Sequence, residues 1–350
     1  MKIPILSFLL VLGQSIFGQL NSFTNLLQQY HQNKGFSGAV LMASNGQIEY
    51  MNAIGEADKK AGQRLTVSSK FKIASMTKMF TAVLVMKLVE EGKISLEQSF
   101  GNYFPGYRGE GKDKVTVHQL LTYSSGIKNE LEPLGMRPYQ AKFSLDEFID
   151  KYCSGKLVML PGEKSTYGNT EYIILQKIIE NVSGKSFEKL LQDVVLKPLG
   201  LKNTGVVKTH LKTGELVKTY TYRDSIKAFA ADAPYYTENY FAAGAIYSTL
   251  EDLLHFSNAL FQQKILKPET VEQMLTINEK LGHTTYGFWG SRGWGNINEP
   301  FYYRTGGILG ARANWMYTVG TKKTIIVLSN TDATNLYELS EQLYLLSANR

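Results

Sequence analysis

The chain has 350 residues, of which 43% are hydrophobic and 20% are charged, and its formal net charge is +7. This composition is typical of a folded globular protein with an ample core, and it excludes a disordered, collagen-like or disulfide-rich chain. The 38 Lys and Arg residues are scattered without a run of five or more, so we expect a solvated basic surface and no nucleic-acid partner.

The N-terminus predicts a secretory signal peptide over residues 1–18. A positive charge at Lys2 precedes a short apolar stretch, and a small residue stands at Gly18. The alternative is a buried N-terminal helix, but the stretch has no polar face, and it is too short to span a bilayer. No later apolar run approaches ~20 residues, so we expect a secreted or periplasmic protein without stable membrane insertion.

Apolar periodicity predicts a short helix and then a hairpin after this segment. Apolar residues recur at helical spacing over 23–30, which is typical of an amphipathic helix. Two apolar runs within 36–53 flank the pair Asn45-Gly46. An Asn-Gly pair in that position is a strong signal for a two-residue hairpin turn.

The middle of the chain is predicted to be mostly helical. Long apolar helices are expected over 75–92 and over 169–184, the second ending at a glycine. A third helix is expected to open with a capping box, in which Ser248 and Glu251 satisfy the free backbone N–H groups of the first turn.

The C-terminal part predicts strands again and then a last helix. The strands are expected over 302–305, 311–318 and 324–329, and the helix over 336–346. Strands at both ends with helices between them predict an α+β fold, in which one antiparallel sheet is built from both termini and flanked by helices.

This pattern also predicts how a domain over 19–350 is divided into two lobes. The sheet lobe would take about 19–74 and 285–350, and an inserted, mainly helical lobe would take about 75–284. A cleft is expected between the two lobes, and residues that carry chemistry should meet there.

The pattern Ser-x-x-Lys occurs four times, starting at Ser69, Ser75, Ser125 and Ser186. Only Ser75 has a long apolar helix behind it, and a serine at a helix N-terminus lies near free N–H groups and the positive dipole end, which favour an oxyanion. Lys78 would face the same side of the helix and could take the serine proton if burial lowers its pKa. From this segment alone, a capping Ser75 beside an exposed lysine remains the simpler interpretation.

A second candidate segment is Tyr167-Gly168-Asn169, which precedes the apolar helix over 169–184. A tyrosine beside a lysine ammonium loses its proton more easily and can serve as a base. The Asn169 amide can both donate to and accept from a substrate amide. Taken alone, Tyr167 is more often a packed aromatic, and the same pattern at Tyr50 lies within a predicted strand.

The third candidate segment is a predicted strand that carries Arg304, Thr305 and two glycines. Glycines let a substrate backbone approach a strand edge, and the Gly307 N–H could complete an oxyanion hole with that of Ser75. Arg304 could attract a carboxylate, although a solvated strand charge is the alternative. A competing match at 212–214 lies in a polar segment and predicts a surface turn.

Together and in this order, the three segments resemble the serine β-lactamase and penicillin-binding-protein superfamily, in the Tyr-x-Asn form that is similar to class C β-lactamases. The resemblance extends from about Phe36 to the C-terminus. The surrounding stretches that carry it are Phe71–Lys78, His118–Gly126, Ala243–Asp252 and Ile325–Asn330.

The resemblance implies a serine hydrolase that forms an acyl-enzyme through Ser75. In this family Lys78 and Tyr167 would share the general-base work, and Asn169 would position the substrate. Thr305 and Gly307 would hold the substrate and the oxyanion.

The substrate is left open by Arg304, which stands where the family usually carries Lys or His. A β-lactam, a D-amino-acid peptide or an ester is expected, with peptidoglycan fragments among the candidate partners. The alternative is a non-catalytic protein of the same fold that binds or senses a peptidoglycan-type ligand. The five His residues show no ligand spacing, so we expect no metal and no cofactor.

Overall fold

The computed structural model of the chain describes residues 5–208 and 215–348. The competing match at 212–214 lies outside the described residues.

A six-stranded antiparallel sheet, in the order β10-β11-β12-β13-β1-β2, is the centre of the fold. Its strands are β1 (Gly38–Ser44), β2 (Gln47–Ile54), β10 (Trp289–Ser291), β11 (Phe301–Ile308), β12 (Ala311–Thr318) and β13 (Lys323–Ser329). β1 pairs with β13 along its whole length, with Gly38 opposite Ser329. The N-terminal hairpin therefore joins the C-terminal strands directly, which confirms the α+β fold with a sheet from both termini.

The predicted hairpin is confirmed as β1 and β2. Asn45 has φ +50° and Gly46 has φ +80°, so both turn residues are left-handed, as the hairpin turn favoured by Asn-Gly requires. Tyr50, the first residue of the competing Tyr-x-Asn match, is buried in β2.

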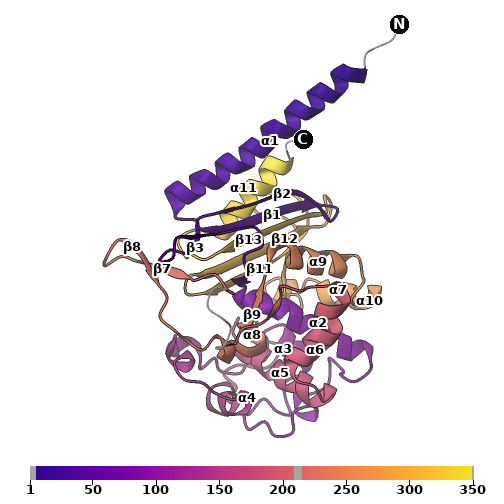
Figure 1. The fold of residues 1–350 in the computed structure, drawn as a ribbon. Helices are drawn as coiled ribbons and strands as arrows, with labels where there is room; N and C mark the ends of the chain where they lie inside the picture. The colour runs from indigo at the N-terminus through magenta and orange to yellow at the C-terminus, as the bar shows by residue number, and fades with distance from the viewer. Residues whose placement is uncertain (1–4, 209–214, 349–350) are drawn as a thin grey trace.

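The two faces of the sheet are covered by different helices, and strand alternation sends side chains to both. Val40 and Met42 pack in one core with helices α1 (Ile5–Lys34) and α11 (Leu336–Ala348). Ala39 and Leu41 face the opposite core, where α9 (Leu250–Phe261) lies on β1 and β13. Figure 1 shows α1 and α11 on one side of the sheet and the other helices beyond the opposite side.

The helical region is organised around α2 (Thr77–Glu90), which is buried on almost every side. A helix that is apolar all round is a core helix, and α2 packs against α5 (Thr170–Ser183) and α8 (Phe241–Gly244). The other helices are α3 (Val117–Leu121), α4 (Leu145–Phe148), α6 (Phe187–Leu191), α7 (Lys197–Leu199) and α10 (Pro268–Leu275). The division of the domain at residues 74 and 285 stays a prediction.

Smaller sheets connect these layers. They are β3 (Glu56–Asp58) with β4 (Gln63–Arg64), β5 (Phe71–Lys72) with β9 (Ile246–Ser248) and β6 (Gly205–Val206), and β7 (Tyr220–Arg223) with β8 (Ala228–Ala231).

The predicted capping box of α9 is wrong by one residue. Thr249 is the N-cap, and its hydroxyl accepts a hydrogen bond from the backbone N–H of Asp252. Ser248 still belongs to strand β9, and its hydroxyl lies 2.7 Å from that of Thr204. The extended backbone at Ser248 therefore moves the start of the helix one residue onward.

Helix α1 runs through part of the predicted signal peptide and through the predicted helix over 23–30. The signal peptide itself stays a prediction. Among the described residues, no helix is both long enough and apolar enough to cross a membrane.

Substitution of Gly38 by Ala is expected to destabilise the sheet where the two ends of the chain meet. An added Cβ would overlap the carbonyl oxygen of Leu328 on the neighbouring strand, so the strands must separate at a cost of about 1–3 kcal/mol. Thermal unfolding should show a lower midpoint. Gly106→Ala is the matched control, because its Cβ would meet only a ring atom of Phe104 at an ordinary 3.6 Å. Equal midpoints for the two variants would contradict this expectation.

Candidate active site

Ser75 lies in a tight helical turn, Ala74–Met76, directly before α2. Ala74 has φ +46°, a left-handed conformation that L-residues adopt at a cost, and such strain is found where a site requires it. Strand β11 packs closely against this turn, because a Cβ at Gly306 would overlap the carbonyl oxygen of Ile73. The absence of a side chain at Gly306 thus lets the strand lie beside Ser75.

Lys78 is fully buried one turn after Ser75, and its ammonium is surrounded by oxygen atoms. Its Nζ lies 2.8 Å from Asn169 Oδ1 and 2.8 Å from the carbonyl oxygen of Ala243. It also lies 3.1 Å from the hydroxyl of Tyr167 and 3.2 Å from Ser75 Oγ. Burial lowers the pKa of Lys78 to about 8, although the opposite charge of an ionised Tyr167 works against this effect.

The hydroxyl of Tyr167 is the centre of the cluster. It lies 2.7 Å from Ser75 Oγ and accepts hydrogen bonds from Lys78 Nζ and from Arg304 Nη2, the latter at 3.0 Å. Although 43% of the Tyr167 surface is exposed, the hydroxyl end is enclosed by these groups. Burial alone would raise the pKa of Tyr167, but the charges of Lys78 and Arg304 outweigh it and lower the pKa to about 7.

Arg304 is buried and bound to protein oxygens, and its expected role toward a substrate carboxylate stays a prediction. Its side chain is 1% exposed, and its three nitrogens donate to protein oxygens. Nε donates to the backbone carbonyl of Ser75, Nη1 to the hydroxyl of Tyr123 and Nη2 to that of Tyr167, each at 3.0 Å. All three nitrogens of the guanidinium are therefore occupied by protein oxygens beside Ser75 and Tyr167.

The other predicted residues of β11 point the opposite way. Along the strand, Arg304 and Gly306 are buried, whereas Thr305 and Gly307 are exposed. β10 pairs with β11 only through 301–303, so within the described chain the following part of β11 has no strand partner on that side. An extended substrate can lie along such an open strand edge.

Asn169 and Gly307 line one cavity of about 370 Å³, together with Tyr167. Tyr139 and Tyr240 form part of its wall as a stacked pair, with ring centroids 3.8 Å apart. Two of the three predicted segments therefore line one cavity, and the third adjoins it through the contacts of Ser75 and Lys78 with Tyr167.

The other three Ser-x-x-Lys serines have structural partners instead. Ser69 accepts a hydrogen bond from the backbone N–H of Thr66 in a turn. Ser125 donates to the carboxylate of Glu171 at 2.7 Å, and Ser186 is the N-cap of α6.

Tyr123 and Glu171 belong to the site although neither was predicted. Tyr123 stacks against Tyr172 and Trp289 and holds Arg304 through its hydroxyl. Glu171 is buried at the start of α5, where burial raises its pKa, and its charge in turn acts on Lys78. An acidic residue in the first turn of a helix is ordinary, so the sequence carried no signal for Glu171.

Arg312 is a third residue that sequence reasoning missed. It is the cross-strand partner of Gly307, and its Nη1 lies 2.6 Å from the place where a Cβ of residue 307 would be. Unlike Arg304, Arg312 is half-buried, so a cation does stand beside the exposed side of β11. The two-residue turn Leu309-Gly310 joins β11 to β12 and places Arg312 opposite Gly307. The sequence alone would predict this pair only if the pairing of the two strands were already known.

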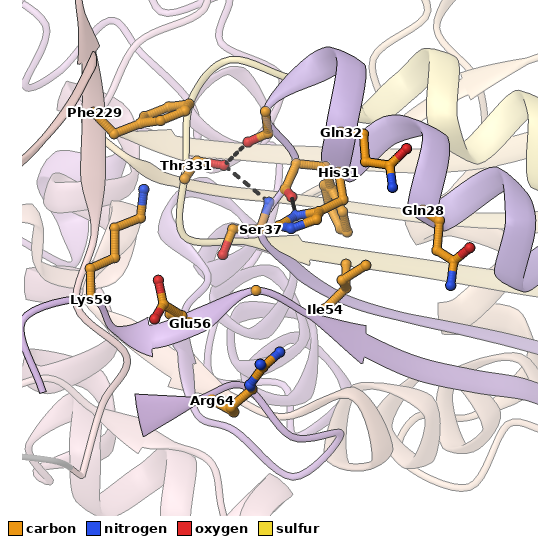
Figure 2. Close-up of a pocket in the computed structure, with 13 residues that line it drawn as sticks. Gln28, His31, Gln32, Ser37, Ile54, Glu56, Lys59, Arg64, Phe229 and Thr331 are labelled. Atoms are coloured by element: carbon orange, nitrogen blue, oxygen red, sulfur yellow. Dashed lines mark hydrogen bonds between the residues drawn. The ribbon is translucent and has the colours of Figure 1, made fainter. Parts of the chain in front are cut away.

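A separate cavity of about 500 Å³ lies between the C-terminal end of α1 and the strands β2 and β3. Figure 2 shows Lys59, Arg64 and Glu56 around it, with Ser37 and His31 on the α1 side. It contains none of the predicted site residues. Within the described ranges, no three His, Cys, Asp or Glu side chains gather so that they could hold a metal ion.

Known proteins share both the sequence pattern and the fold. The Beta-lactamase family model matches residues 23–350. A penicillin-binding protein of Bacillus subtilis is 27% identical over 340 residues, which cover 91% of this chain and 73% of that protein. A teichoic acid D-alanine hydrolase of Staphylococcus aureus is 24% identical over 279 residues, which cover 79% and 68% of the two chains.

Among solved structures, a D-amino acid amidase from Ochrobactrum anthropi superposes with a TM-score of 0.82. The alignment covers 95% of this chain and 99% of the amidase at 22% identity. At that identity the likeness concerns the fold.

Tyr167 is expected to ionise far below the range of the other tyrosines. Titration of tyrosinate absorbance should reveal one tyrosine with a pKa of about 7, and this step should disappear in Tyr167→Phe. The reason is that the charges of Lys78 and Arg304 stabilise the phenolate. Identical curves for both proteins below about pH 9 would contradict the expected pKa.

Proposed function

The chain belongs to the Beta-lactamase family, and on that premise we propose that it is a serine hydrolase that forms an acyl-enzyme through Ser75. The observation that carries the proposal is the position of Ser75 Oγ, 2.7 Å from the hydroxyl of Tyr167 and 3.2 Å from Lys78 Nζ. A nucleophile in hydrogen-bond contact with a group of near-neutral pKa is the arrangement that covalent catalysis requires.

The proposed reaction begins with proton transfer from Ser75 to the phenolate of Tyr167. The serine oxygen attacks the substrate carbonyl, and the negative charge that develops on the carbonyl oxygen is held by the backbone N–H groups of Ser75 and Gly307. Tyr167 then gives its proton to the leaving nitrogen or oxygen as the bond to the carbonyl carbon breaks. Water releases the acyl group through the same steps, with Tyr167 again as base.

Lys78, Arg304 and Asn169 have supporting roles in this proposal. The two cations keep Tyr167 ionised near neutral pH, and Lys78 also orients Asn169, whose Oδ1 accepts from its Nζ. The amide nitrogen of Asn169 would then be available to a carbonyl oxygen of the substrate. Thr305, on the exposed side of β11, would contact the substrate along the strand.

The substrate proposed is a β-lactam, a D-amino-acid peptide or an ester. The relationship to a penicillin-binding protein and to a teichoic acid D-alanine hydrolase supports this set. With the signal peptide predicted over 1–18, the protein would act outside the cytoplasm or in the periplasm, where peptidoglycan fragments are candidate substrates.

The alternative of a non-catalytic binding or sensor protein arose from Arg304 in place of the usual Lys or His. The Arg304 guanidinium donates to the hydroxyl of Tyr167. An arginine at this position therefore keeps a positive charge beside the proposed base, as a lysine would. This contact favours the enzyme over the binding protein.

Replacement of Ser75 by Ala should abolish covalent labelling by a fluorophosphonate or a penicillin. Lys78→Ala should slow labelling by about 10²–10⁴-fold, since one buried charge that supports the base is lost. Ser69→Ala is the matched control, because it removes another Ser-x-x-Lys serine from a surface turn. Labelling of Ser75→Ala at the wild-type rate, or saturable peptide binding without acylation in the wild type, would overturn the proposal.

The rate should rise with pH through about 7, because Tyr167 becomes a phenolate above its lowered pKa. In Arg304→Met the rising part of the curve of rate against pH should move to higher pH by about one unit or more, since one of the two charges that lower the pKa of Tyr167 is removed. Arg304→Lys keeps the charge and should shift the curve less. The measurement is kcat/KM against pH, and an unmoved curve in Arg304→Met would exclude Tyr167 as the titrating base.

A further inference from the structure

The cavity beside the reacting groups carries one carboxylate and no cation. Glu132 lines it, and none of its lining residues is Lys, Arg or His. The cavity adjoins the reacting groups, because Tyr167 lines it and the Tyr167 hydroxyl lies 2.7 Å from Ser75 Oγ. A substrate group that lies beside Glu132 therefore meets negative charge, while the Arg312 cation stands beside Gly307 at the β11 side of the space.

Glu132 is held in place but is not neutralised. Its backbone N–H donates to Asn129 Oδ1, and its carboxylate receives a long hydrogen bond, 3.4 Å, from Asn129 Nδ2. Glu132 takes part in none of the ion pairs of the described chain. The neighbouring Glu130, by contrast, is paired with Lys128 at 2.8 Å and does not line the cavity.

One side of the wall is apolar, whereas Asn129, Tyr167 and Asn169 make the rest of it polar. Tyr139 and Tyr240 are buried and stacked, and Leu131 and Met136 complete the apolar side. An apolar wall on one side reduces the water around a cation in the cavity, which favours its contact with the Glu132 carboxylate although that carboxylate faces solvent. An apolar wall can also pack against the acyl part of a substrate, which stays bound to the serine after the leaving group departs.

We propose that this cavity holds the acyl part of the substrate and that Glu132 pairs with a positively charged amine on it. The substrate class is then an aminoacyl amide or ester with a free ammonium group. This inference rests on the proposed function, because the acyl group is the one that Ser75 would carry. An acyl group with a carboxylate in the same place is disfavoured by like charge.

The test compares two substrates of nearly equal shape. Alanine p-nitroanilide, in both stereoisomers, carries an ammonium where isobutyryl p-nitroanilide carries a methyl group. In the wild type, kcat/KM for one alanine isomer should exceed that for the isobutyryl compound. Glu132→Gln should reduce the alanine value by about 10-fold or more and leave the isobutyryl value unchanged, since a hydrogen-bonded charge pair is lost.

Two further variants sharpen the test. Glu130→Gln removes a carboxylate from the same loop outside the cavity, and it should keep the wild-type preference. Glu132→Lys should lower the alanine value further and raise that of succinyl p-nitroanilide, which carries a carboxylate. Glu132 is exposed, so neither of its variants should disturb folding.

The outcomes separate this inference from the proposed function. If Glu132→Gln keeps the wild-type preference, or if Glu130→Gln loses it equally, Glu132 does not select an amine, although Ser75-dependent fluorophosphonate labelling would still support the hydrolase. If the wild type cleaves none of these substrates and its Ser75 is not labelled, the proposed function fails and this inference fails with it.

Discussion

Two buried cations enclose the hydroxyl of one tyrosine, and the site depends on this arrangement. Lys78 and Arg304 both donate to the oxygen of Tyr167, and each would cost several kcal/mol to bury without a compensating charge. Ionisation of Tyr167, whose pKa these charges lower to about 7, would supply that charge. In the proposed function, the same interaction that makes two interior cations tolerable would also supply the base for Ser75 near neutral pH.

This arrangement requires three parts of the fold to meet within hydrogen-bond distance. Lys78 comes from the core helix α2, Tyr167 from the segment before α5, and Arg304 from strand β11, next to the edge of the six-stranded sheet. The left-handed backbone at Ala74 and the missing side chain at Gly306 let the turn and the strand approach each other. Because α2 is buried on nearly every side, the lysine has little freedom to leave.

Along β11, the residue that holds Tyr167 is separate from the residues that would contact a substrate. Arg304 and Gly306 face inward along β11, whereas Thr305 and Gly307 face outward, with Arg312 beside Gly307. The lowered pKa of Tyr167 is set chiefly by the charges of Lys78 and Arg304, which lie on the inner side. In the proposed function, substitutions on the outer side would therefore change substrate preference more than the chemistry at Ser75.

Local pattern by itself determined the hairpin at Asn45-Gly46, the helix after Asn169 and the order of the three motif segments, because periodicity and turn chemistry depend on near neighbours. It missed the cap at Thr249, since the end of strand β9 is set by its pairing with distant strands. Only the tertiary structure decided which way Arg304 points. Alternation puts Arg304 and Thr305 on opposite sides of β11, but what lies on each side is set by contacts such as that with Tyr167, 137 residues away.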